Sequence, residues 1–261
     1  MRKNEIIFNK IYILQSLFSN ERKTGDEIFN VIKIESFKNN EVQVELINIH
    51  NKLELISTLN KIDQQTNESV FPLIHFEMHG SSQGIGINNG EFVPWEEVAI
   101  YLRKINVAIQ NNLFVSLATC YGSYLLFSCD PTKPSPFFGY IGPTEKIGNL
   151  ELEADFTIFF QILLLELNFK TAIESIDTDN TKIYKYKFVN CFDLFDLLVA
   201  RINKANENPR IKNLRIKRLV NEYKDKNPGE SKNLIRKRIQ MHILKDEKIL
   251  IDNMKKVFTL S

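Results

Sequence analysis

Two stretches of the chain, LIHFEMHG at residues 73–80 and LFVSLATCYG at residues 113–122, decide the fold. Each begins as a nearly uninterrupted apolar run of the length of a buried strand, and each ends in a reactive side chain close to a glycine. A small hairpin around an Asn-Gly turn and one helix separate them. This strand–helix–strand step predicts parallel strands that lie side by side or nearly so, which brings His79 and Cys120 to one edge of the sheet.

The same alternation of strands and helices runs through residues 1–200. Further strands are predicted at residues 11–15, 41–47, 136–141 and 183–189, and helices at residues 24–32, 51–59, 94–105, 156–167, 171–176 and 191–202. Capping-box spacings, Thr24 with Glu27 and Asn51 with Glu54, mark two helix starts. This order predicts an α/β protein whose mainly parallel sheet is covered by helices on both faces.

Composition limits the class of protein. Hydrophobic residues make up 43% and charged residues 25%, which indicates a globular rather than a disordered chain. No apolar run is long enough to cross a bilayer and the charged N-terminus lacks a secretory signal pattern, so we expect a cytoplasmic protein without a membrane partner. Cys120, Cys129 and Cys191 show no CxxC spacing, which argues against disulfides or a cysteine zinc site and fits a reducing compartment.

Charge divides the chain into two parts. Residues 201–261 carry 17 Lys and Arg against 7 Asp and Glu, a balance of +10, whereas residues 1–200 have a balance of −8. We therefore expect one domain at residues 1–200 and a basic helical extension at residues 201–261, broken at residues 227–229. The extension either meets an acidic surface, on nucleic acid, a partner protein or the domain itself, or is simply a solvated helical segment.

Cys120 and His79 are the residue types of a nucleophilic dyad. A nearby imidazole increases the fraction of thiolate, which is the reactive form of cysteine. The backbone N–H groups of Gly80 and Cys120 are placed to form an oxyanion hole, and Gly80 leaves room for a substrate backbone. Alone, a cysteine at a strand end is usually a buried hydrophobe and a His-Gly pair a turn, but the joint arrangement predicts acyl transfer without a cofactor.

A metal site is the competing interpretation of the same strand. His75, Glu77 and His79 alternate along it and share one face, which offers three possible ligands. No HExxH motif is present, and a strand buried on both faces more often hides its histidine and gives its glutamate a hydrogen-bond partner. We therefore expect no metal site.

These residues resemble the catalytic core of the caspase-like cysteine peptidases of clan CD, and the bacterial CHAT-type proteases among them are the most similar. The resemblance rests on residues 71–80, the glycine-rich hairpin at residues 84–93, and residues 113–122, where ATCYG stands in place of the caspase QAC[RQG]G. It covers about residues 8–200. It implies a three-layer α/β/α sandwich with a six-stranded sheet, and endopeptidase activity through an acyl-enzyme on Cys120 with His79 as general acid/base.

The resemblance also suggests how a substrate is held. Caspases bind an acidic P1 side chain with an arginine after the first strand, and Arg22 lies near that place, although the local pattern is permuted. Other relatives bind a basic P1 side chain with a carboxylate, for which Asp130 and Glu145 are candidates. Each of the three is also read as an ordinary solvated charge.

The resemblance further implies a regulated enzyme that cleaves a protein or peptide substrate, with a role in bacterial defence, antiviral defence included, or in cell death. The alternative is a non-catalytic caspase-like scaffold that binds nucleic acid or a partner protein through residues 201–261. Tyr223 and Phe258 are the aromatic residues of that segment, so contacts to phosphates rather than to bases are expected.

Overall fold

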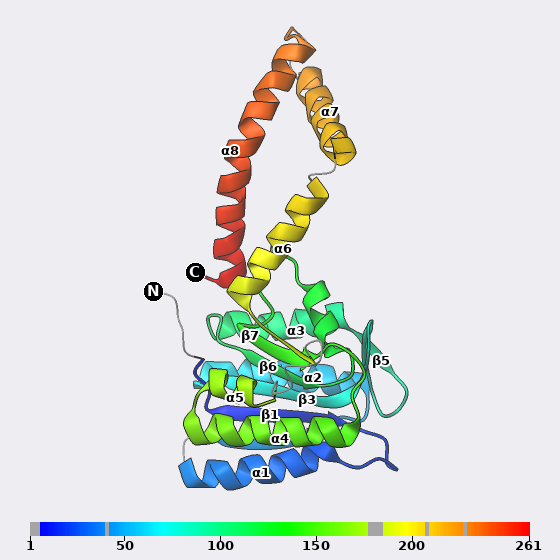
Figure 1. Cartoon of the computed structure of the whole chain (residues 1–261), viewed down its shortest axis with the longest axis vertical. Coiled ribbons are helices and arrows are strands. Elements are labelled where there is room, and N and C mark those ends of the chain that lie inside the picture. Colours follow the sequence, from blue (N-terminus) through cyan, green and yellow to red (C-terminus); the bar gives the residue numbers. More distant parts are fainter. Residues whose placement is uncertain (1–5, 40–41, 177–184, 207–208, 227–228) are drawn as a thin grey trace. The chain divides into compact units, whose positions relative to one another are not determined.

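A computed structural model describes residues 6–39, 42–176, 185–206, 209–226 and 229–261 (Figure 1). The chain divides into two units. Unit 1 comprises Met1–Asp130 and Ser135–Cys191, and unit 2 comprises Pro131–Pro134 and Phe192–Ser261.

The sheet of unit 1 has the strand order β2-β1-β3-β6-β7-β8. These strands are β1 (Lys10–Ser16), β2 (Gln43–Asn48), β3 (Pro72–Ser81), β6 (Phe114–Ala118), β7 (Gly139–Pro143) and β8 (Tyr186–Asn190). All neighbours pair in parallel except β8, which is antiparallel to β7. The predicted mainly parallel sheet is therefore confirmed.

Strand burial follows from position in the sheet. β6 and β7 are buried along their whole length, and β3 is buried until its last three residues, as expected for apolar central strands covered on both faces. β2 is the edge strand and alternates between exposed and partly buried side chains. A short hairpin, β4 (Gly84–Gly86) with β5 (Phe92–Pro94), extends the end of β3.

Helices form the outer two layers (Figure 1). α1 (Thr24–Asn39), α4 (Asn149–Glu166) and α5 (Phe169–Ile176) cover one face, and α2 (Lys52–Gln65) and α3 (Trp95–Ala108) cover the other. Two 3₁₀ turns, η1 (Thr66–Glu68) and η2 (Gly122–Ser128), follow α2 and the end of β6. This is the expected α/β/α sandwich.

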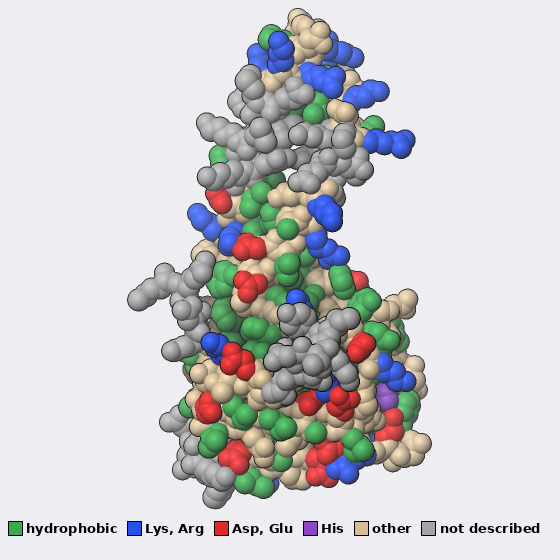
Figure 2. All heavy atoms as spheres, in the orientation of Figure 1, with side chains coloured by type: hydrophobic (Ala, Val, Ile, Leu, Met, Phe, Trp, Pro, Cys, Tyr) green, Lys and Arg blue, Asp and Glu red, His purple; other side chains and the backbone are tan. Residues whose placement is uncertain are grey.

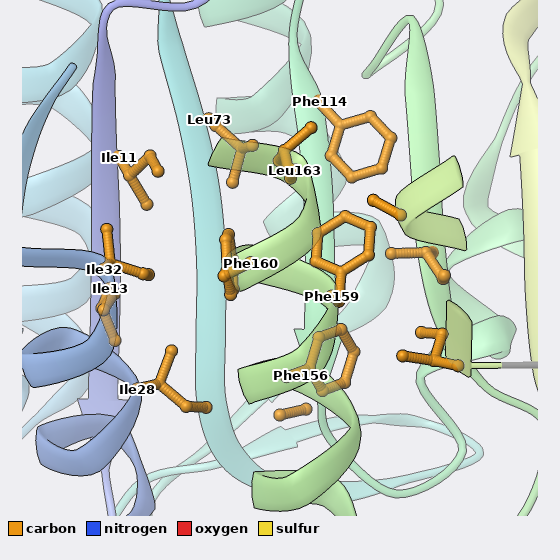
Figure 3. Close-up of a cluster of buried hydrophobic side chains, with 14 of the residues drawn as sticks. Ile11, Ile13, Ile28, Ile32, Leu73, Phe114, Phe156, Phe159, Phe160 and Leu163 are labelled. Carbon is orange, nitrogen blue, oxygen red and sulfur yellow. The ribbon is translucent and has the colours of Figure 1, made fainter. Parts of the chain in front are cut away.

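The core under α4 combines aromatic and aliphatic side chains (Figure 3). Phe156, Phe159 and Phe160 are fully buried and pack with Ile11 of β1 and Ile28 of α1 in one cluster. Burial of each such side chain contributes about 1.5–3 kcal/mol, so this cluster is a main source of stability for the sheet that carries the strand ends.

Several predicted elements shift by a few residues. β7 lies at Gly139–Pro143 rather than at residues 136–141, and α4 begins at Asn149, well before residue 156. Part of the strand predicted at residues 183–189 lies outside the described residues, and β8 is described from Tyr186. These differences are boundary shifts, since each predicted element is present with its predicted type.

One capping box is confirmed and the other is wrong. The side chain of Asn51 accepts a hydrogen bond from the backbone N–H of Glu54 at 2.9 Å and caps α2 as predicted. Thr24 is instead the first helical residue of α1, and its hydroxyl donates to a carboxylate oxygen of Glu77 at 2.6 Å. A tertiary partner therefore takes the hydroxyl that local spacing assigned to the helix.

Unit 2 is helical. It contains most of α6 (Cys191–Asn206), together with α7 (Pro209–Lys226) and α8 (Lys232–Thr259). Ile216 and Val220 of α7 pack against Ile235 of α8, and the Phe195 and Phe258 rings lie 5.7 Å apart. Across the described part of the chain, no helix has the length and apolar character needed to span a membrane.

Candidate catalytic site

The ends of β3 and β6 carry His79 and Cys120 to the same edge of the sheet. The two strands are parallel neighbours, and their register pairs Glu77 with Ala118. His79 and Cys120 follow these residues at matching offsets. β3 continues through His79 into the hairpin, where His79 pairs with Gly86 of β4. The two predicted side chains therefore leave the sheet at corresponding positions, where open α/β sheets bind their ligands.

Gly80 is the point where the two strand ends touch. A Cβ added at residue 80 would overlap the carbonyl oxygen of Cys120 and the Cγ2 methyl of Thr119, closer than real Cβ atoms approach. The sequence predicts that this glycine makes room for a substrate backbone. In the structure, the neighbour that requires a glycine is the backbone of Cys120 itself.

His79 is held from one side while remaining accessible. Its side chain is 40% exposed, and its Nε2 lies 2.9 Å from Oε2 of Glu21. An ionised carboxylate only accepts, so Nε2 carries the proton and Nδ1 of a neutral ring is free to accept another. The Phe18 ring lies against the imidazole, with the two centroids 5.2 Å apart. The imidazole is thus oriented by a carboxylate and an aromatic ring.

Two hydrogen-bond donors hold the carboxylate of Glu21 beside the His79 imidazole. Its Oε2 accepts from His79 and also from the backbone N–H of Phe18 at 2.8 Å. Partial burial acts to raise the pKa of Glu21, but the hydrogen bonds from His79 and from the Phe18 backbone outweigh it, so the net pKa is lowered. The carboxylate is therefore kept ionised beside the imidazole.

Sequence reasoning missed Glu21 and chose its neighbour Arg22. The segment that follows β1 leaves the sheet at the same edge as β3, and so it approaches the end of β3 that carries His79. The guanidinium of Arg22 turns instead to Glu153 of α4, with two nitrogen–oxygen distances of 2.7 Å. Lys23 ties the segment to itself by donating to the carbonyl oxygens of Leu17 and Phe18.

Cys120 sits in a tight turn after β6. Its thiol is partly exposed, with Sγ 3.7 Å from the carbonyl oxygen of Ile147. Tyr121 follows in the left-handed region at φ 58°, which is uncommon for a residue other than glycine. The N–H of Gly122 then donates to the carbonyl of Thr119 at 2.9 Å and closes the turn. The turn directs the chain away from the sheet directly after the thiol.

The other two thiols differ from Cys120 in exposure. Cys129 and Cys191 are buried, and burial raises the pKa of Cys129 to about 12. Cys191 accepts a hydrogen bond from the side-chain amide of Asn111 at 3.2 Å. Cys120 is thus the least buried of the three cysteines.

The two acidic candidates for substrate binding lie in different places. Glu145 has an exposed side chain, and its carbonyl oxygen accepts from the N–H of Tyr121 at 3.2 Å, which puts it next to the cysteine turn. Asp130 is partly buried and follows Cys129 beyond the end of η2. The structure therefore brings Glu145 next to the cysteine turn, whereas Asp130 lies after η2, at the far end of the segment that follows this turn.

The three alternating residues of β3 do not converge on one point. His75 and Glu77 are buried and bonded to each other, with Nε2 of His75 3.1 Å from Oε1 of Glu77. His79 bonds to Glu21 instead. In the part of the chain that the structure describes, no group of three or more His, Cys, Asp or Glu residues is arranged to hold a metal ion.

Comparison with known proteins gives little guidance. No protein-family model matches the chain. The chain is 23% identical over 167 residues to the chloroplastic acetyl-coenzyme A carboxylase carboxyl transferase subunit beta of Lotus japonicus. The similarity covers 64% of this chain but 31% of that protein, so the chain spans about a third of its length. This match assigns neither a family nor an activity.

Proposed function

We propose that the chain is a cysteine endopeptidase in which Cys120 is the nucleophile and His79 the general acid/base. The observation that carries the proposal is the junction of two parallel strand ends, where Gly80 lies against the backbone of Cys120 and Glu21 orients the imidazole. The partial exposure of both reactive side chains further supports it. The resemblance to caspase-like peptidases gives the reaction its class.

In the first half of the proposed reaction, Nδ1 of His79 accepts the proton of the Cys120 thiol. The thiolate attacks the substrate carbonyl carbon, a C–S bond forms, and the carbonyl π electrons move onto oxygen. The backbone N–H groups of Gly80 and Cys120 stabilise this oxyanion. As the intermediate collapses, the imidazolium gives its proton to the leaving nitrogen, the C–N bond breaks, and a thioester remains on Cys120.

In the second half, water replaces the leaving amine. His79 accepts a proton from water as its oxygen attacks the thioester carbon, and a second oxyanion forms in the same place. The C–S bond breaks, the carboxylic acid product leaves, and the thiol recovers its proton from the imidazolium. The ionised Glu21 favours the imidazolium that forms in both halves.

Glu145 is the better supported candidate for binding the P1 side chain. An acidic P1 side chain would compete with Glu153 for the guanidinium of Arg22, whereas the carboxylate of Glu145 is exposed beside the cysteine turn. We therefore expect cleavage after Lys or Arg. A library of peptides varied at P1 measures this, and Glu145→Gln is expected to reduce that preference.

The wider setting belongs to the same proposal. We expect the enzyme to act in the cytoplasm on a protein partner, under the control of another factor, in bacterial defence or regulated cell death. The free cysteines support a reducing compartment, and the need for control follows from the damage that an unregulated protease would cause there.

A peptidyl electrophile and a peptide library test the dyad together. The electrophile is expected to label Cys120 in the wild type and to fail in Cys120→Ala, and His79→Ala is expected to label slowly. Both variants are expected to lose cleavage of every peptide that the wild type cuts. Cys129→Ala is the matched control, since that thiol is buried, and it should label and cleave as the wild type does.

Equal cleavage by the wild type, Cys120→Ala and His79→Ala would exclude the dyad. Labelling spread evenly over the three cysteines of the native protein would contradict special activation of Cys120. A wild type that is labelled at Cys120 yet cuts no peptide would favour the second candidate function.

That second candidate is a caspase-like scaffold that binds nucleic acid through α7 and the first part of α8. Among the side chains whose exposure the structure describes there, the exposed cations are Arg210, Lys217, Arg218, Lys232, Arg236 and Lys237. Lys and Arg side chains gather over this end of unit 2 (Figure 2). Such a surface supports salt-dependent contacts with phosphates.

Titration with single-stranded and duplex DNA at several salt concentrations tests this candidate. Replacing both Lys217 and Arg236 by Glu is expected to weaken binding to all sequences alike. For each phosphate that the variant no longer neutralises, the salt slope should fall by about 0.9 on duplex DNA and about 0.7 on single-stranded DNA. Lys170→Glu on α5, in unit 1, is the matched control. Binding that ignores salt or these substitutions would exclude the phosphate surface.

A further inference from the structure

A buried polar chain lies behind the candidate dyad and takes no part in the proposed reaction. Ser116, His75, Glu77 and Thr24 are each at most 3% exposed. Oγ of Ser116 lies 2.8 Å from Nδ1 of His75, Nε2 of His75 lies 3.1 Å from Oε1 of Glu77, and Oγ1 of Thr24 lies 2.6 Å from Oε2 of Glu77. Four polar side chains at this depth need a reason, because burial of polar groups is costly.

Every polar side-chain atom of this buried polar chain has a hydrogen-bond partner in one consistent arrangement. The carboxylate of Glu77 accepts from the Thr24 hydroxyl at one oxygen and from Nε2–H of His75 at the other. Nδ1 of His75 then accepts from the hydroxyl of Ser116. Loss of any one partner would leave a buried polar group unpaired, so the chain fixes the positions of its members.

The buried polar chain ends at Thr24, close in sequence to Glu21, which orients the His79 imidazole. Glu77 and His79 lie on the same face of β3; their partner Glu21 lies in the connection between β1 and α1, and their partner Thr24 is the first residue of α1, directly after that connection. β3 therefore holds this connection at two points. The point at Thr24 is buried, whereas the point at Glu21 is partly exposed and carries the contact to His79.

Close packing leaves the buried point little freedom. The N–H of Gly25 donates to Oε1 of Gln15 at 2.9 Å, and a Cβ at residue 25 would meet both that oxygen and Cγ of Glu77. The start of α1 thus lies directly on β1 and β3. A shift of Thr24 would move the connection, and with it Glu21.

We propose that Thr24 and Glu77 are positioning residues of the site, which act on His79 through Glu21 by fixing the connection between β1 and α1. The inference rests on the proposed function, because it assigns these residues a task in the same reaction. A purely structural role predicts a loss of stability without a change in the reactivity of Cys120, and the two roles are separable by experiment.

A double-mutant cycle on Cys120 reactivity tests the inference without requiring peptidase activity. The rate of Cys120 alkylation by iodoacetamide at neutral pH is measured by mass spectrometry in the wild type, Thr24→Val, Glu21→Gln and the double variant. Each single variant is expected to slow alkylation about tenfold, the scale of one hydrogen bond to a charged group. The double variant is expected to be no slower than Glu21→Gln, since Thr24 acts through Glu21.

Two further variants separate positioning from stability. Thr24→Ser keeps the hydroxyl and is expected to restore the wild-type rate. Ser116→Ala breaks the chain at its far end, so it is expected to lower the melting temperature while Cys120 reacts at the wild-type rate. Thr24→Ala removes the same hydroxyl without a branched side chain and replaces Thr24→Val if that variant does not fold.

The outcomes distinguish failure of this inference from failure of the proposed function. A folded Thr24→Val that alkylates at the wild-type rate, or a double variant in which the two slowings multiply, would overturn the inference. His79→Ala serves as the reference for the dyad. If it alkylates as fast as the wild type, the proposed function fails; if it alone is slow, only the role of Thr24 and Glu77 fails.

Discussion

Gly80 offers the most direct single-residue test of the junction between the strand ends. Gly80→Ala places a methyl group against the carbonyl oxygen of Cys120, so the two ends must separate. Overpacking of this kind costs about 1–3 kcal/mol, and we expect slower alkylation of Cys120 together with a lower melting temperature. Gly148→Ala is the matched control, because a Cβ there meets nothing within 4 Å. Equal alkylation rates in the two variants would contradict the junction.

Glu21 gives the site a dependence on pH whose sign is fixed by the structure. Its pKa is lowered in the folded state, so its ionised form contributes stability above its unfolded pKa, and this contribution is lost as the pH falls through the folded pKa. We expect Glu21→Gln to melt below the wild type at neutral pH and the difference to vanish in acid. Melting temperatures across pH measure this.

Glu166→Gln is the control for that series, since Glu166 is an exposed carboxylate at the end of α4. A difference between wild type and Glu21→Gln that stays constant from neutral to acid pH would mean that the carboxylate does not hold His79.

For single residues, the sequence predicts a site role where the residue type is distinctive and misses it where the residue type is common. A histidine and a cysteine at the ends of two neighbouring strands stand out as a pair, and the structure brings both to one edge. Glu21 looks like any charged loop residue between Asn20 and Arg22. Its role depends on a 2.9 Å contact with a residue far along the chain, which no local pattern encodes.

Helix starts were predictable where the local capping pattern and the tertiary contacts of the same side chain agree. The Asn51 cap of α2 has no competing partner, and the predicted hydrogen bond forms. Thr24 is also a common capping residue, but its hydroxyl donates to the buried carboxylate of Glu77 instead. The apolar run begins after the start of α4, because the first turns of this helix carry the acidic residues Glu151, Glu153 and Asp155. The apolar run predicted the buried part of that helix and not its start.

Phe160 tests how far the aromatic face of α4 supports the sheet. Its ring is fully buried and lies 5.1 Å from the ring of His75, the histidine of the buried polar chain. Phe160→Ala is expected to lower the free energy of unfolding by about 3–5 kcal/mol, because it removes the contacts and leaves a cavity. Leu165 of the same helix is 71% exposed, and Leu165→Ala is expected to change that free energy by less than about 0.5 kcal/mol.

Urea unfolding of the two variants gives both values. A similar loss at Phe160 and Leu165 would mean that the two faces of α4 are buried alike, contrary to the cluster of buried phenylalanines.

For the whole molecule, the distribution of charge and the packing of side chains divide the chain at different residues. The balance of −8 over residues 1–200 and of +10 over residues 201–261 predicts a body and a basic extension. Packing groups Phe192–Ser261 together, because Phe195 of α6 meets Phe258 near the end of α8 and Lys255 pairs with Asp196 at 3.0 Å. Composition could not reveal this return of the chain, since it depends on contacts between residues far apart in the sequence.

Phe258→Ala tests whether unit 2 unfolds on its own. Its ring is fully buried, so its loss is expected to weaken unit 2 by about 3–5 kcal/mol. Hydrogen exchange should then accelerate in residues 192–206 and 249–261, while the strands β3 and β6 keep their protection. Val257→Ala, with a 45% exposed side chain, is the control and should leave exchange unchanged. Faster exchange throughout the sheet of unit 1 would mean that the two units unfold together, and the proposed site would then depend on the basic extension for its stability.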